Sequence, residues 1–143
     1  MGILQYIFNQ RTPEEKNTHG AVTNTTPHLL LGRTGEEIAA VYLTNKGYRI
    51  IEMNWKTGVG EIDIIAQKDA MRVCVEVKTR KTKDFGYPEE SVTAKKREKL
   101  RKLAEIYQRL HRLKKFPRID VVSIIYSTYG EHQVTHFKDI GWQ

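Results

Sequence analysis

The sequence contains almost no cysteine and no long apolar segment. Cys74 is the single cysteine, which excludes an intrachain disulfide and favours a reducing compartment. No apolar run approaches the roughly 20 residues that a helix needs to cross a bilayer. The opening MGILQYIF lacks the basic start and the small-residue cleavage site of a signal peptide. We therefore expect a cytoplasmic protein with no membrane-spanning segment.

Charge, by contrast, is abundant. Charged residues make up 29% of the 143 residues, the formal net charge is +7, and hydrophobic residues account for 39%. A chain of this size and composition fits one domain with a modest core. The basic balance favours a polyanionic partner, either nucleic acid or an anionic membrane surface.

The first part of the chain differs in character from the rest. Residues 9–28 are polar, rich in Thr and Asn and without periodicity. We expect the short apolar stretch before them either to dock weakly or to stay mobile. The sequence thus predicts a flexible N-terminal arm over residues 1–28 and a single domain over residues 29–143.

The domain is predicted to alternate helices and strands. Helical spacing starts at Pro27, and Gly47 is a natural end for this first helix. A second helix over residues 94–115 follows Thr93, which is suited to cap it, and ends before Pro117. The predicted strands cover residues 48–55, 61–66, 71–79, 119–126 and 132–138. This order predicts an α/β fold in which helices flank a mixed sheet.

The second and third predicted strands contain acidic residues within apolar, β-branched runs. If an even-numbered turn over residues 67–70 joins them, Asp63 lies opposite Cys74. Glu61 then lies opposite Glu76, which is diagonal to Asp63. One face of this hairpin carries only apolar side chains, those of Ile62, Ile64, Ala66, Val73, Val75 and Val77. The other face carries Glu61, Asp63, Ile65, Arg72, Cys74, Glu76 and Lys78.

Carboxylates that converge on one patch need a compensating cation. Two neighbouring carboxylates repel and raise each other's pKa unless a cation intervenes. Mg²⁺, or Mn²⁺ in its place, takes oxygen ligands and usually keeps waters that a substrate can displace. Lys78 would then hold an attacking hydroxide or a phosphate oxygen. The alternative is an exposed sheet face with Glu–Lys pairs, each of which contributes only ~0.2–1 kcal/mol.

The first helix contributes a further acid. Glu36 shares a helical stripe with small and apolar residues, namely Gly32, Ala39, Ala40 and Leu43. Small neighbours would let this helix lie close to the sheet and direct Glu36 toward the patch of Asp63 and Glu76. The alternative is that Glu36 and Glu37 merely favour the N-terminal half of the helix dipole.

The second helix carries the excess positive charge. Residues 94–115 contain ten Lys or Arg and two Glu. A narrow apolar seam would dock this helix on the sheet, formed by Leu100, Leu103, Ala104, Tyr107 and Leu110. Its cations would bind phosphates, although a solvated face and a membrane-surface helix are alternatives. The predicted nucleic-acid contacts are Arg80, Lys81, Lys95, Lys96 and Lys99.

Four stretches of the chain carry a family resemblance: GRTGEEIAAVYLTNKGY, NWKTGVGEIDIIA, VCVEVKTR and PRIDVVSI. They resemble the motifs of the YraN-like family of small bacterial proteins. That family has a PD-(D/E)xK nuclease-like fold and is distantly similar to archaeal Holliday-junction resolvases. The resemblance implies a restriction-endonuclease-like αβββαβ core. The proline of the fold's namesake motif is missing, because Ile62 precedes Asp63.

The resemblance also implies roles for individual residues. Glu36 would be the acid of the first helix, and it would join Asp63 and Glu76 in binding the metal. Lys78 would be the lysine of the ExK element. Asp120 also matches a family position, for which we expect either a structural role or a role in supporting the metal ligands. Dimers occur among resolvase-like relatives, so a homodimer is a further expectation.

Two functional hypotheses follow from these residues. The first is a Mg²⁺-dependent endonuclease that hydrolyses phosphodiester bonds in DNA, with branched or structured DNA among its substrates. Its catalytic residues would be Glu36, Asp63, Glu76 and Lys78. The second is a non-catalytic nucleic-acid-binding module on the same nuclease-like fold.

Overall fold

The computed structural model describes residues 27–81, 92–126 and 131–142. Residues 1–26 of the predicted arm lie outside these ranges, whereas its last two residues, 27 and 28, belong to the first helix. In chain order the elements are α2 (Pro27–Asn45), β1 (Arg49–Lys56), β2 (Glu61–Lys68), β3 (Met71–Arg80), α3 (Ala94–Leu110), β4 (Arg118–Tyr126), β5 (His132–Phe137) and the 3₁₀ helix η3 (Ile140–Trp142). The predicted order of helix, three strands, helix and strand is confirmed.

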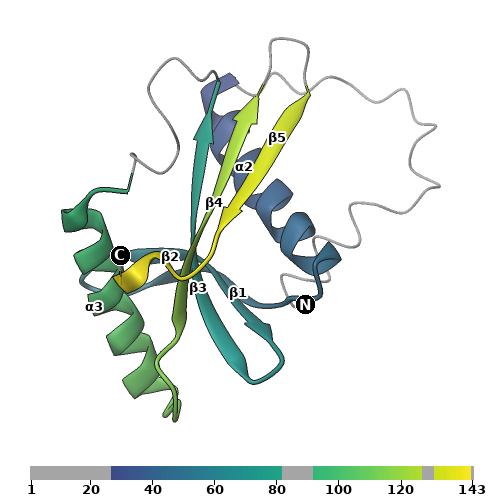
Figure 1. The fold of residues 1–143 in the computed structure, drawn as a ribbon. Coiled ribbons are helices and arrows are strands. Elements are labelled where there is room, and N and C mark those ends of the chain that lie inside the picture. The colour runs from purple at the N-terminus through teal and green to yellow at the C-terminus, as the bar shows by residue number, and fades with distance from the viewer. Residues whose placement is uncertain (1–26, 82–91, 127–130, 143) are drawn as a thin grey trace.

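The strands form one mixed sheet in the order β1-β2-β3-β4-β5. Neighbouring strands are antiparallel except β3 and β4, which are parallel. A parallel pair needs a long crossover connection, and α3 lies in it. Figure 1 shows α2 and α3 on opposite sides of the sheet. The protein is therefore an α/β protein with helices flanking a mixed sheet, as predicted.

Each face of the sheet has its own hydrophobic core. On the α2 face the buried residues are Ala39, Ala40, Leu43, Tyr48, Ile50, Ile64, Ala66, Val73, Val75, Val122 and Ile124. On the α3 face they are Trp55, Ile62, Ile65, Cys74, Val92, Leu100, Leu103, Ala104, Tyr107, Ile119, Val121 and Ile140. Each fully buried Leu, Ile or Val side chain contributes about 1.5–3 kcal/mol, so the central strands are a firm support for side chains at their ends.

The ends of α2 and the start of α3 follow from local sequence. Gly47 adopts a φ of +90°, a left-handed conformation that glycine takes readily, and its amide donates to the Thr44 carbonyl. At α3 the Thr93 hydroxyl accepts a hydrogen bond from the Lys96 amide at 3.2 Å. Both boundaries were predicted from these residues.

The C-terminal end of α3 was predicted too far along the sequence. The helix ends at Leu110 rather than near residue 115, because Arg112 adopts a left-handed φ of 50°. Leu110 is 67% exposed, so its assignment to the apolar seam was wrong. The other four seam residues are buried, namely Leu100, Leu103, Ala104 and Tyr107.

The β2–β3 hairpin has an even-numbered turn, but its register differs from the prediction. Lys68 pairs with Met71, so the loop consists of only two residues. Gln67 lies in the strand, where its side chain accepts from Arg72 Nε at 2.7 Å. Ile65, rather than Asp63, therefore faces Cys74. The shorter turn shifts Asp63 along β3 toward Glu76.

Candidate functional site

The strands β2 and β3 separate at one end of their ladder, and Asp63 lies at that point. The last backbone pair is Ile64 with Val75. Beyond it, the Val77 amide donates to Asp63 Oδ2 at 2.8 Å. A side-chain oxygen thus satisfies an amide that has lost its backbone partner. The Asp63 carboxylate is thereby held between the two strands.

The same separation corrects the predicted faces of the hairpin. Ile62 was expected on the face that carries Ile64. It is instead buried in the core beneath α3, while Ile64 belongs to the core beneath α2. Regular alternation requires a continuous strand pair, and the β2–β3 ladder ends between these two residues. The β2–β3 ladder ends at Ile64 and Val75, so Glu61 pairs with no residue of β3 and its predicted position opposite Glu76 was also wrong. Its partner is Lys56 of β1.

Asp63 and Glu76 form a carboxyl pair. Burial is the main cause that raises the pKa of Asp63 from 3.8 to about 7, and the charge of Glu76 raises it further. The Val77 amide lowers this pKa in part, and a hydrogen bond joins the two carboxyl groups. A cation bound beside Asp63 would favour the ionised form of its carboxyl group and so oppose this rise in pKa.

Two lysines contact Glu76 from different elements. Lys78 Nζ of β3 lies 3.5 Å from Glu76 Oε1, and Lys96 Nζ of α3 lies 3.0 Å from the same oxygen. The Glu76 side chain is 8% exposed, whereas each lysine side chain is 33% exposed. The sequence predicted Lys96 as a phosphate contact. It gave no sign that the first turn of α3 faces Glu76.

Glu36 approaches the carboxyl pair from the α2 side. The helix lies so close to β3 that a Cβ at Gly35 would meet the Thr79 side chain. Burial raises the pKa of Glu36, a hydrogen bond from Asn54 lowers it, and the charges of Glu61 and Glu76 raise it again. The structure therefore brings Glu36 within electrostatic reach of the Asp63–Glu76 pair.

Asn54 is a site residue that the sequence interpretation missed. Its Nδ2 donates to Glu36 Oε2 at 3.0 Å, which orients the carboxylate. Asn54 adopts a left-handed φ of 53° within β1. Asparagine is among the few residues that adopt this conformation readily, so an Asn within an otherwise strand-like run was the available signal.

The donor chemistry of the carboxyl pair fits a hard divalent cation. Mg²⁺ is commonly bound by one or two carboxylates, with waters and substrate phosphates as the other ligands. Asp63 and Glu76 supply such a pair of carboxylates. Glu36 of α2 is a third acid within electrostatic reach of them. Within the described ranges, no group of three or more His, Cys, Asp or Glu side chains is arranged as a complete metal site. Waters and substrate phosphates would supply the remaining ligands of an ion held by this pair.

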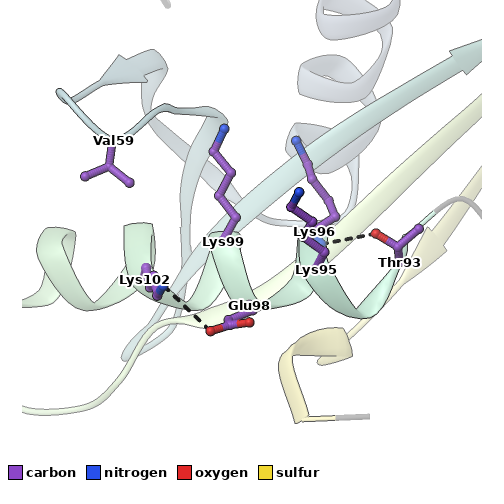
Figure 2. A pocket seen from close by; sticks show the side chains of 7 residues that line it. All are labelled: Val59, Thr93, Lys95, Lys96, Glu98, Lys99 and Lys102. Atoms are coloured by element: carbon purple, nitrogen blue, oxygen red, sulfur yellow. Dashed lines mark hydrogen bonds and ion pairs between the residues drawn. The ribbon is translucent and has the colours of Figure 1, made fainter.

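A groove rich in lysine borders the carboxyl pair. We call it the lysine groove; it has a volume of about 460 Å³ and is lined by Val59, Thr93, Lys95, Lys96, Glu98, Lys99 and Lys102. Figure 2 shows Lys99 extending from α3 on the side of the β1–β2 turn that carries Val59, with Lys95 and Lys96 at the start of the helix. Lys102 forms an ion pair with Glu98 at 3.6 Å. Lys96 is the residue that belongs to both the groove and the carboxyl pair.

The turn opposite α3 is held in shape by Thr57. Its hydroxyl accepts from the amides of Val59 and Gly60 at 3.1 and 3.3 Å. A Cβ at Gly60 would lie 2.9 Å from Lys99 Cε, so the absence of a side chain leaves room for this lysine. The other predicted phosphate contacts, Arg80 and Lys81, lie at the end of β3 and do not line the groove.

Asp120 has a separate, buried network. It is fully buried and accepts from Arg118 at 2.7 and 2.8 Å, from His136 Nε2 at 2.7 Å and from the Asp139 amide at 3.0 Å. Burial would raise the pKa of Asp120, but these hydrogen bonds outweigh it and hold the pKa below its usual value. The network ties β4 to β5 and to the Tyr48 hydroxyl, which accepts from Arg118. These contacts agree with the structural role expected for Asp120, which stays a prediction.

The fold and the site define the class of protein as a small α/β protein with an αβββαβ core, in which an acidic pair lies where two central strands separate. The chain belongs to the uncharacterised protein family UPF0102, whose model matches residues 35–124. This confirms the predicted YraN-like membership. Within the described residues, neither helix has the length and apolar character needed to cross a bilayer.

Relatives in this family are similar over most of their length. A UPF0102 protein of Arthrobacter sp. (strain FB24) is 43% identical over 114 residues, which cover 78% of this chain and 96% of that protein. A UPF0102 protein of Dictyoglomus turgidum is 44% identical over 102 residues, with coverages of 71% and 86%. Among solved structures, the Holliday junction resolvase Hjc of Archaeoglobus fulgidus is 18% identical, with a TM-score of 0.41 over 75% of this chain and 86% of that one.

Proposed function

We propose that the protein is a divalent-metal-dependent endonuclease that hydrolyses phosphodiester bonds in DNA. The observation that carries the proposal is the Asp63–Glu76 carboxyl pair, in which Glu76 is buried and Asp63 half-buried, and which borders the lysine groove through Lys96. Burying an acidic side chain costs free energy unless a cation compensates its charge. Such acids beside a phosphate-binding surface are typical of a functional site. Branched DNA is included among the substrates because the sequence motifs resemble those of resolvase-like nucleases.

Asp63 and Glu76 would hold Mg²⁺ or Mn²⁺. Such a cation lowers the pKa of a water and stabilises the charge that develops on the phosphate. Glu36, oriented by Asn54, would complete or orient the ligand set from the α2 side. The Val77 amide fixes Asp63, so little reorganisation of this ligand would be required.

The remaining residues would position substrate and water. Lys78 would hold the hydrolytic water by donating a hydrogen bond from its ammonium group. The water would give up a proton to solvent as its oxygen attacks phosphorus, the ester P–O bond would break, and the leaving oxygen would take a proton from solvent. The lysine groove would bind phosphates that flank the scissile bond, with Lys95 and Lys99 as contacts. No covalent intermediate with the protein is needed.

Cleavage of linear, nicked and four-way-junction DNA with Mg²⁺ or Mn²⁺ tests the proposal. We expect Glu76→Ala and Lys78→Ala to reduce the rate by at least a factor of about 100. Glu61→Ala is the matched control, because Glu61 is an exposed acid of the neighbouring strand β2 that pairs with Lys56. Equal rates in the wild type and all three variants would identify a contaminating nuclease and refute the proposal.

One observation favours a second candidate, the nucleic-acid-binding module without turnover. The Lys96 ammonium already compensates the charge of Glu76 at 3.0 Å. A binding module needs no Mg²⁺, so its melting temperature would not respond to Mg²⁺ through Glu76. The endonuclease, by contrast, is expected to show a Mg²⁺-dependent increase in melting temperature that Glu76→Gln abolishes. Thermal melts with Mg²⁺ and with EDTA distinguish the two.

A further inference from the structure

Lys96 belongs to two sites at once. Its side chain lines the lysine groove, and its ammonium lies 3.0 Å from Glu76 Oε1. The other lysines of the groove have different surroundings. Lys102 pairs with Glu98, and Lys99 lies against Gly60 of the β1–β2 turn. Figure 2 shows Lys96 in the first turn of α3, beside the capping residue Thr93.

The Lys96 side chain can change partner without any change of the backbone. Its backbone amide is fixed by the Thr93 hydroxyl, so the start of α3 is held in place. The side chain is 33% exposed and has a flexible four-carbon stem, whereas Glu76 is 8% exposed. A rotamer change would therefore move the ammonium from Glu76 to the groove while Glu76 stays where it is.

A divalent cation and the Lys96 ammonium compete for the same oxygen. Both are attracted to Glu76 Oε1, and they repel each other at contact distance. A phosphate in the lysine groove attracts the ammonium in the opposite direction. Bound nucleic acid would consequently remove the nearer of the two ammonium groups on this oxygen, since Lys78 Nζ lies farther away at 3.5 Å. Bound metal would favour the phosphate-bound position of Lys96.

We propose that Lys96 couples nucleic-acid binding to metal binding. Its ammonium neutralises Glu76 in the protein without ligands and moves to a strand phosphate in the lysine groove when nucleic acid binds, which frees Glu76 for the divalent cation. This inference rests on the proposed function and deepens it. By thermodynamic reciprocity each ligand increases the affinity for the other by the same factor, roughly 5-fold or more. Lys96 is a positioning residue in this scheme.

The first test measures metal affinity in the absence of nucleic acid. Mn²⁺ is titrated into the full-length chain by calorimetry at constant salt. We expect Lys96→Met to bind Mn²⁺ roughly 5- to 10-fold more tightly than the wild type, because the competing ammonium is gone. Lys99→Met is the matched control, since it removes a groove lysine that does not contact Glu76, and its Mn²⁺ affinity should equal that of the wild type.

The second test measures the coupling itself. The affinity for a fluorescein-labelled 20-base-pair duplex is measured by anisotropy with Mg²⁺ and with EDTA, on DNA that a gel shows to be intact. In the wild type we expect Mg²⁺ to tighten binding roughly 5-fold. Lys96→Met should reduce this factor to about 1, Lys99→Met should weaken binding but keep the factor, and Lys96→Arg should retain part of it. Thermal melts in EDTA confirm folding, and Lys96→Gln replaces Lys96→Met if the latter does not fold.

Two results would overturn the coupling. One is an Mn²⁺ affinity of Lys96→Met no tighter than that of the wild type. The other is an undiminished effect of Mg²⁺ on DNA affinity in that variant. Either result would leave the proposed function standing if wild-type Mn²⁺ binding still depends on Glu76. A wild type whose Mn²⁺ binding is unchanged by Glu76→Gln would refute both the coupling and the proposed metal site.

Discussion

Gly35 of α2 lies so close to Thr79 of β3 that the Thr79 side chain occupies the space of a Cβ at position 35. The Cβ of Thr79 would itself be only 3.3 Å from such an atom. This contact fixes the distance between α2 and the sheet at the helical turn that carries Glu36. The position of Glu36 relative to the Asp63–Glu76 pair therefore depends on glycine at position 35.

Gly35→Ala is expected to destabilise the protein by about 1–3 kcal/mol, because the added methyl group must push the helix from the sheet. Urea unfolding measures the change. Gly58→Ala is the matched control, since a Cβ at Gly58 meets nothing within 4 Å. Removing the Thr79 hydroxyl with Thr79→Ala should recover part of the loss. An equal, small effect of both glycine variants would contradict the close contact.

Asp63 should make the metal-free protein less stable as the pH rises. Its folded-state pKa of about 7 lies above the ordinary value of 3.8. The folded state thus binds the proton more tightly, so the contribution is fully present below about pH 4 and is lost as the pH rises through 7. In EDTA at pH 8, Asp63→Asn should exceed the wild type in stability by about 1–3 kcal/mol.

Urea unfolding at pH 5 and pH 8 checks the effect of Asp63. The asparagine side chain can still accept from the Val77 amide, so this variant removes the charge and keeps the hydrogen bond. Glu61→Gln is the control for loss of one negative charge from the same strand. A wild type and an Asp63→Asn variant with the same dependence on pH would show that Asp63 is already ionised without cost.

The lysine groove should determine the salt dependence of DNA binding. Each phosphate contact that is lost reduces the slope of log K against log salt by roughly 1. We expect this reduction for Lys95→Ala and for Lys99→Ala, measured by anisotropy over a range of salt concentrations. Lys46→Ala is the control, because Lys46 follows α2 on the opposite side of the sheet. A similar loss of slope in Lys46→Ala would indicate general attraction without a defined path for the strand.

Asp120 is expected to be essential for folding rather than for metal binding. Asp120→Ala would leave Arg118 without its buried partner, at a cost of about 3–5 kcal/mol. Because the pKa of Asp120 is lowered in the folded state, its stabilisation is present above pH 3.8 and is lost as the pH falls further. Acid unfolding of the wild type and of Asp120→Asn measures this. Unchanged acid unfolding in Asp120→Asn would contradict it.

The local features of this fold could be read from the sequence, since they depend on neighbours along the chain. Gly47 ends α2 because a left-handed residue is needed there, and Thr93 begins α3 because its hydroxyl reaches an amide of the first turn. Alternation also placed Asp63 and Glu76 on the same face as Cys74, even though the register was wrong. A shift of two residues in the pairing of β2 and β3 keeps each side chain on the same face of the sheet, so the prediction that Asp63 and Glu76 lie near each other did not depend on the correct register.

Only the tertiary structure decided which groups meet. The β2–β3 ladder ends at Ile64 and Val75, so Asp63 turns its carboxylate to the Val77 amide and Ile62 enters the core beneath α3. Lys96 reaches Glu76 because α3 packs its apolar seam on that face of the sheet. Such contacts join segments far apart in the chain, and their geometry is set by how whole elements pack, which no local pattern of residues specifies.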